Sequence, residues 1–182
     1  MRAVELVFAA GWGAFWLYWL AAAFSTKRGR IPWSRELRIR VVIVAAAVIA
    51  ARLGALRGHG LNADVWRAGI GLALFASGLL FAVWARVHIG RNWGTPMTQK
   101  HEPELVTSGP YRLVRHPIYS GILVAGLGTA VALSWWWLAA FGLAAIYFLY
   151  AATVEERFLS EQFPATYPVY KQATRMLVPF VF

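Results

Sequence analysis

The segment GPYRLVRHPIYSG, residues 109–121, places basic and aromatic side chains directly before an apolar run that extends from Ile118 to Leu133. Pro117 suits the first turn of a helix and favours an extended conformation at His116, so we predict that His116 is the residue at the helix boundary. The imidazole, the guanidinium of Arg115 and the unpaired N–H groups of the first turn are then expected to face the membrane surface. Such a group can hold an anion. The alternative is a basic anchor that only orients the helix.

Two successive acids, Glu155 and Glu156, follow an apolar run at residues 135–153. If helicity continues past that run, the carboxylates project beside the start of the preceding helix, near His116 and Tyr119. Carboxylates in this position can accept hydrogen bonds from an ammonium group or from two ribose hydroxyls. The alternative is that they are solvated charges paired with Arg157 or Arg115, each pair worth about 0 to 1 kcal/mol.

The composition of the 182 residues is that of an integral membrane protein: 59% are hydrophobic and only 14% are charged. The net charge of +10 comes from basic residues in short loops between apolar runs, which indicates membrane topology and no binding of nucleic acid. The chain has no cysteine, which excludes disulfides and a thiolate nucleophile. Its four histidines lack the spacing of metal ligands, so we expect no metal site.

We predict an all-α integral membrane protein of five transmembrane helices. The expected spans are residues 4–24, 41–56, 66–85, 117–133 and 135–153. Of the 18 Lys and Arg residues, 14 fall in residues 25–40, 86–116 and 154–182, which places these segments in the cytoplasm, the N-terminus outside and the C-terminus inside. We expect the protein in the bacterial inner membrane, with its site facing the cytoplasm.

Small residues predict where the spans approach closely. Gly71, Ser77, Gly78 and Ala82 form a small-residue face on the third span. The fourth and fifth spans are expected to form a helical hairpin, in which Gly121 with Ala125 and Gly126 with Ala130 allow close backbone approach.

Three motifs occur together: LVTSGPYRLVRHPIYSG at 105–121, EERFL at 155–159, and a Y-x-x-Y pattern from 167 that ends in LVPF at 177–180. With the RNWG at 91–94, this pattern resembles the isoprenylcysteine carboxyl methyltransferase family over about residues 66–182. The resemblance implies a single membrane domain in which residues 1–65 are an N-terminal helical pair and residues 66–182 the methyltransferase core. It also implies S-adenosylmethionine as cofactor and, as partners, membrane lipid and a lipophilic or lipidated acceptor.

The resemblance also implies the residues of the site. The cofactor contacts would be Pro103, Glu104, Leu105, Val106, Tyr111, His116, Pro117, Ile118, Tyr119 and Glu155. The acceptor contacts would be Arg86, Asn92, Trp93 and Glu156. No catalytic residue is assigned, because a sulfonium methyl is already activated and its transfer depends mainly on alignment. A thiol or amine acceptor would need a base, for which Glu156, Tyr119 and His88 are the candidates.

One position departs from the family pattern. Eukaryotic members carry an Arg one helical turn before the glutamate pair, thought to hold the substrate carboxylate, and here Ala151 takes that place. Arg86 can substitute as the anion anchor or serve only as a topology charge. Two other functions stay open: a sterol-reductase type of enzyme with a nicotinamide cofactor, and a non-enzymatic membrane protein.

Overall fold

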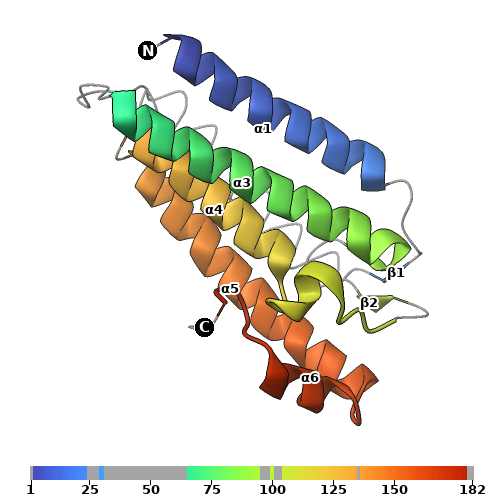
Figure 1. The fold of residues 1–182 in the computed structure, drawn as a ribbon. Coiled ribbons are helices and arrows are strands. Elements are labelled where there is room, and N and C mark those ends of the chain that lie inside the picture. The colour runs from blue at the N-terminus through green and yellow to red at the C-terminus, as the bar shows by residue number, and fades with distance from the viewer. Residues whose placement is uncertain are drawn as a thin grey trace.

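The computed structural model describes residues 2–23, 29–30, 65–94, 99–100, 104–134 and 136–179. Its α-helices are α1 (Arg2–Ala23), α3 (Val65–Ile89), α4 (Pro117–Ala132), α5 (Trp136–Gln162) and α6 (Tyr167–Ala173). In Figure 1, α4 lies between α3 and α5, α1 runs along the outer side of α3, and α6 lies at the end of the bundle where α4 begins. We call the end of the bundle where α4 begins the site end.

Short elements lie at the same end. The 3₁₀ helices η1 (Gly90–Asn92) and η2 (Gly109–Arg112) follow α3 and precede α4, and β1 (Gly29–Arg30) pairs antiparallel with β2 (Gln99–Lys100). The predicted second span, residues 41–56, lies outside the described residues.

Three of the described helices are long and apolar enough to cross a membrane, over Ala3–Ala22, Val65–Asn92 and Trp136–Gln162. The 16 residues of α4 rise only about 24 Å, less than the roughly 30 Å of a hydrocarbon core. The helical architecture, with three helices that are long and apolar enough to span a membrane, is therefore confirmed. The count of five spans and their orientation stay predictions. Helicity continues through the glutamates to Gln162, as expected.

Glycine brings α3 and α4 into close contact. A Cβ atom added at Gly78 would lie 2.4 Å from the Ala125 nitrogen, and one at Gly71 would lie 2.6 Å from the Gly128 oxygen. The expected small-residue face of the third span is thus confirmed at Gly71 and Gly78, although Ser77 is exposed.

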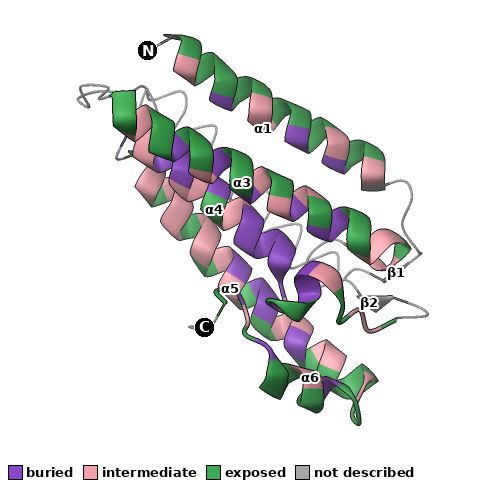
Figure 2. Cartoon of the chain, viewed as in Figure 1, coloured by how far each residue is buried: buried purple, intermediate pink, exposed green. Residues whose placement is uncertain are grey.

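The expectation that the same kind of contact joins α4 to α5 is wrong. A Cβ added at Gly121 would meet Gly78 and Ala82 of α3, whereas one at Gly126 would meet only Phe141, at 3.7 Å. Larger side chains separate α4 from α5, because the glycines of α4 that permit close approach lie on the side facing α3. Figure 2 shows the resulting burial of α4 within the bundle.

Replacing Gly78 by alanine is expected to lower the free energy of unfolding by about 1 to 3 kcal/mol, because the methyl group would overlap the α4 backbone. Gly69→Ala is the matched control on the same helix, since a Cβ there has no atom within 4 Å. Alanine favours a helix over glycine, so the control should be neutral or stabilising. Thermal unfolding in detergent measures both, and equal midpoints for the two variants would contradict the close contact.

Aromatic side chains attach α1 to the bundle. Phe8 packs on Phe75 with ring centroids 4.6 Å apart, and the Trp12 indole donates to Thr129 Oγ1 at 3.2 Å. Further along the same face, Trp19 is buried at the site end. The rest of α1 is largely exposed, as Figure 2 shows. The helix therefore contributes to the site through one stripe of aromatic residues.

Candidate active site

The end of α3 is fastened to the end of α1 by Arg86, whose side chain is buried. Its Nη1 donates to the Gly90 carbonyl at 2.9 Å and its Nη2 to the Ala22 carbonyl at 2.6 Å. The guanidinium also lies over the Trp93 ring, 4.6 Å from the centroid. Since α3 extends to Ile89, Arg86 lies inside the helix and not in the loop that was expected to begin at that residue.

The segment before α4 is laid against the end of α3. Gly109 has a φ of +58°, and a Cβ there would lie 2.6 Å from the His88 ring, so the turn requires glycine. His88 Nε2 hydrogen-bonds Ser108 Oγ at 2.9 Å, and its ring stacks on Tyr111. Burial raises the pKa of Tyr111, so its hydroxyl stays neutral at physiological pH.

The start of α4 is paired with the C-terminal tail, residues 174–179. The Arg115 amide donates to the Arg175 carbonyl at 2.8 Å, and the His116 amide donates to the Met176 carbonyl at 3.1 Å. Ser120 Oγ adds a bond of 2.6 Å to the Leu177 carbonyl. His116 does precede the first residue of α4, as predicted, but its own N–H is not open to a ligand because the tail accepts it.

Glu156 is buried in an ion cluster. Its Oε1 lies 2.6 Å from Arg115 Nε, and its Oε2 lies 2.7 Å from Lys171 Nζ of α6. Arg115 also donates to the carbonyls of Lys171 and Thr174. The pairing of a glutamate with Arg115 is thus confirmed, in buried form. The expectation that the Arg115 guanidinium faces the membrane surface is wrong, because this carboxylate and the tail carbonyls hold it inside.

His116 lies between the two glutamates. Its Nδ1 is 3.4 Å from Glu155 Oε2, and its Nε2 is 3.7 Å from Glu156 Oε1. Burial by itself lowers the pKa of His116, but the two carboxylates outweigh burial, so the pKa is raised and the imidazolium is favoured. The Tyr119 hydroxyl donates to Glu155 Oε1 at 2.5 Å. The Glu155 side chain keeps 23% of its surface exposed, against 4% for Glu156.

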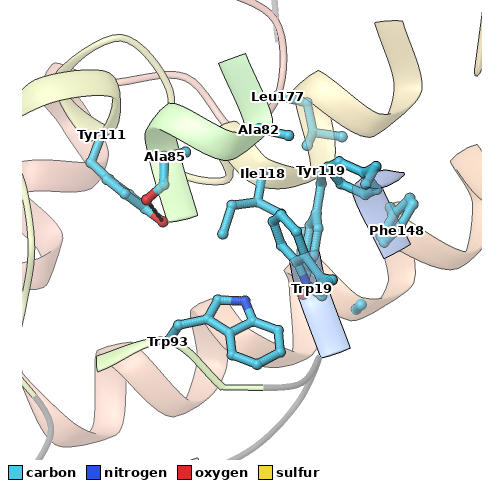
Figure 3. Close-up of a cluster of buried hydrophobic side chains, with 12 residues drawn as sticks. Trp19, Ala82, Ala85, Trp93, Tyr111, Ile118, Tyr119, Phe148 and Leu177 are labelled. Carbon is cyan, nitrogen blue, oxygen red and sulfur yellow. Dashed lines mark hydrogen bonds between the residues drawn. The ribbon is translucent and has the colours of Figure 1, made fainter. Parts of the chain in front are cut away.

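An aromatic layer supports these polar groups. The rings of His116 and Tyr119 stack in parallel with centroids 5.5 Å apart, and Tyr119 stacks on Phe148 of α5 at 4.6 Å. Figure 3 shows Tyr119, Ile118, Phe148 and Leu177 in one buried cluster that also includes Trp19 and Trp93. Residues from α1, α3, α4, α5 and the tail therefore meet at the site end.

Most of the predicted site residues come together here. The polar cluster and its aromatic support contain His116, Ile118, Tyr119, Glu155 and Glu156. Near the end of α3 lie Tyr111, Trp93 and Arg86. Pro117 is the buried first residue of α4, and Leu105 and Val106 are half-buried in the segment that precedes η2. Asn92 donates to Glu104 at 2.9 Å, which links η1 to that segment. Pro103 lies outside the described residues.

Sequence reasoning missed several members of the site. Lys171 pairs with Glu156, and Tyr170 donates to the Tyr111 carbonyl at 2.6 Å. The Y-x-x-Y pattern marked this helix, although not the partners of its residues. Trp19 and Phe148 carried no signal, since apolar aromatic residues in a membrane span are equally compatible with lipid contact.

The chain is similar to several known proteins. Residues 66–166 match the family described as phospholipid methyltransferase. Protein-S-isoprenylcysteine O-methyltransferase B of Arabidopsis thaliana is 32% identical over 127 residues, which are 67% of this chain and 64% of the plant protein. A probable protein-S-isoprenylcysteine O-methyltransferase of Oryza sativa subsp. indica is 31% identical over 169 residues, covering 90% of this chain and 88% of the rice protein.

A third relative carries a different name. The nickel-cobalt-cadmium resistance protein NccN of Alcaligenes xylosoxydans xylosoxydans is 32% identical over 130 residues, which are 70% of this chain and 59% of that protein. Within the described part of this chain, no group of three or more His, Cys, Asp or Glu side chains could hold a metal ion.

The chain belongs to the phospholipid methyltransferase family, among relatives named as isoprenylcysteine O-methyltransferases. The resemblance seen in the motifs is thereby confirmed. The match spans 64% of the length of the Arabidopsis protein.

Proposed function

We propose that this protein is a membrane methyltransferase that transfers the methyl group of S-adenosylmethionine to a lipophilic acceptor. The observation that carries the proposal is the partly exposed carboxylate of Glu155 beside the imidazole of His116, at the start of the short helix α4. The bound donor would supply a sulfonium methyl that is already activated, so the protein has mainly to align donor and acceptor.

The charges of the site suit the amino-acid end of this donor. An α-amino acid carries an ammonium and a carboxylate side by side, and Glu155 with a protonated His116 presents the complementary pair. His116 Nε2 is buried without a hydrogen-bond partner among the described residues, with Glu156 Oε1 at 3.7 Å, and we propose that a ligand carboxylate completes its hydrogen bonding. Tyr119, which donates to Glu155, would help to hold that carboxylate in place.

We propose that the other cofactor contacts form an apolar wall beside these charges. Leu105, Val106 and Tyr111 suit an adenine ring, which favours apolar and aromatic surroundings. Pro117 and Ile118 would support the charged pair from the first turn of α4. By the resemblance, Pro103 and Glu104 would also contact the cofactor.

The acceptor is proposed to come from the bilayer and to meet Trp93, Asn92 and Arg86. The ring of Trp19 in α1 meets the ring of Trp93, which directly follows η1, with centroids 5.8 Å apart. Ala151 is fully buried at the position where the resemblance implies an Arg, so a carboxylate acceptor would depend on Arg86 for its countercharge. We therefore propose an isoprenylcysteine-like carboxylate as the first acceptor to test, with a thiol or amine as the alternative.

Binding of radiolabelled S-adenosylmethionine and of a reduced nicotinamide cofactor to the purified protein tests the function. The proposal expects saturable binding of the first and none of the second, followed by transfer of label to a small prenylated cysteine. Binding of the nicotinamide cofactor alone would favour the reductase alternative. Failure to bind either compound would favour a non-enzymatic role.

The proposed orientation places the site end in the cytoplasm, because the basic segments lie there. Gly29 and Lys100 are partners in the β1–β2 pairing, so both must lie on the same side of the membrane, which we propose is the cytoplasmic side. In intact cells, an impermeant thiol reagent is expected to leave Gly29→Cys and Lys100→Cys unlabelled. It is expected to label Asn62→Cys, which lies between the predicted second and third spans on the outer side. The chain has no cysteine of its own, which removes background labelling. Labelling of position 29 or 100 would reverse the topology.

A further inference from the structure

The two successive glutamates of α5 differ in what they contact. Both oxygens of Glu156 are engaged by cations of the chain, Oε1 by Arg115 at 2.6 Å and Oε2 by Lys171 at 2.7 Å. Only 4% of its side chain is exposed, against 23% for Glu155. Glu156 therefore presents its carboxylate to the interior of the protein, whereas part of Glu155 remains accessible to a ligand.

The cations around Glu156 connect separate segments of the site. Arg115 precedes α4 and donates to the carbonyls of Lys171 and Thr174, while Lys171 belongs to α6. The backbone amides of Arg115 and His116 donate to the tail at Arg175 and Met176. The Glu156 carboxylate thus lies where the start of α4, α5, α6 and the tail are joined.

The imidazole of His116 is the third group that meets this carboxylate. Its Nε2 lies 3.7 Å from Glu156 Oε1, and its Nδ1 lies 3.4 Å from Glu155 Oε2. The charged and titratable groups that face it are the hydroxyl-bearing ring of Tyr119 on α4, Glu155 and Glu156 on α5, the neighbouring Arg115, and Lys171 of α6 through Glu156. The carboxylate of Glu156 attracts the His116 imidazolium. Arg115 and Lys171 compete with His116 for that carboxylate.

We infer that Glu156 is a positioning residue: without meeting the ligand, it fixes His116 in orientation and charge and holds the C-terminal tail against the start of α4. Its action on the ligand, through His116 and Glu155, rests on the proposed function. This role differs from the acceptor contact that the resemblance implies for Glu156.

Titration of the His116 imidazole by NMR tests the inference directly, using the full chain with isotope-labelled histidine and assignment by His116→Asn. In Glu156→Gln the titration midpoint is expected to move to lower pH, because one of the carboxylates that favours the imidazolium is gone. In Lys171→Met the midpoint is expected to move to higher pH, because a cation that competes for Glu156 is gone. Glu161→Gln, exposed on the same helix, should leave the midpoint unchanged.

The inference is supported if the His116 titration midpoint moves down in Glu156→Gln and up in Lys171→Met. A change in packing alone would not be expected to move the midpoint in opposite directions in the two variants. Shifts in the same direction, or no shift in Glu156→Gln, would overturn it. Should Glu156→Gln fail to fold, Lys171→Met decides alone, since its side chain is half exposed. For that variant, an unmoved or lowered midpoint overturns the inference.

Binding of S-adenosylmethionine provides a second readout. Glu156→Gln is expected to weaken binding several-fold at neutral pH, and the loss should shrink at mildly acidic pH, where His116 regains its proton. An equal loss at both values would mean that Glu156 touches the ligand and would overturn the positioning role. If the unmodified protein does not bind S-adenosylmethionine at all, the proposed function fails, and the titration still decides the role of Glu156.

Discussion

Replacement of Glu155 by glutamine is expected to weaken S-adenosylmethionine binding by about 10- to 150-fold. The estimate corresponds to the loss of one charge-assisted hydrogen bond, worth about 1.5 to 3 kcal/mol. Glutamine keeps the size of the side chain but cannot supply the negative charge that an ammonium group requires. The fold should persist, because the partners of Glu155 include a neutral hydroxyl from Tyr119 and its side chain is partly exposed.

Glu161→Gln is the matched control, since Glu161 lies on the same helix and is exposed. Isothermal calorimetry of both variants in detergent measures the difference. Equal affinities would remove Glu155 from the cofactor site, and so from the observation that carries the proposed function. If both variants bound S-adenosylmethionine more weakly, the loss would instead be explained by the reduced negative charge of the protein surface.

The positions of these acids and of the helix boundary could be predicted from the sequence because each depends on local chemistry. Pro117 fixes where α4 begins, and an apolar run followed by helix-forming residues carries α5 past the glutamates. The approach of Glu155 and Glu156 to His116 then follows from two helices meeting at one end. The structure confirms this approach: His116 lies near both carboxylates, and Tyr119 donates to Glu155.

The difference between the glutamates could not be predicted in this way. Successive residues of a helix point about 100° apart, so one of two adjacent side chains can be buried while the other stays partly exposed. Which of them is buried depends on how α5 is rotated in the bundle, and that rotation is set by contacts with α4 and α6. Lys171, which completes the ion cluster, is separated from Glu156 by the turn before α6.

The pairing of the tail with the start of α4 had no sequence signal either. Its hydrogen bonds run from the amides of Arg115 and His116 to the carbonyls of Arg175 and Met176, and backbone groups are the same in every residue. The choice between α3 and α5 as the close partner of α4 was also ambiguous. Small residues on α4 predict that some helix approaches closely, without saying which one.

Replacement of His116 by alanine is expected to weaken binding of S-adenosylmethionine more than binding of its decarboxylated form. If the imidazolium balances the cofactor carboxylate, a ligand without that group has less to lose. Measuring both ligands with both proteins isolates the pairwise contribution from any change in the shape of the site. Equal weakening of the two ligands would mean that His116 only shapes the start of α4, as a basic anchor would.

The effect of His116 should also depend on pH, with a sign set by its neighbours. Burial lowers the pKa of His116, but Glu155 and Glu156 raise it further than burial lowers it, so the folded value lies above the ordinary value of 6.5. The stability that the imidazolium contributes is then fully present below pH 6.5 and is lost as the pH rises through the folded pKa. The preference for the carboxylate-bearing ligand should fall over the same range, and His116→Asn, which is neutral throughout, should show no such fall. A preference that stays constant across this range in the unmodified protein would show that the charge of His116 has no part in holding the ligand.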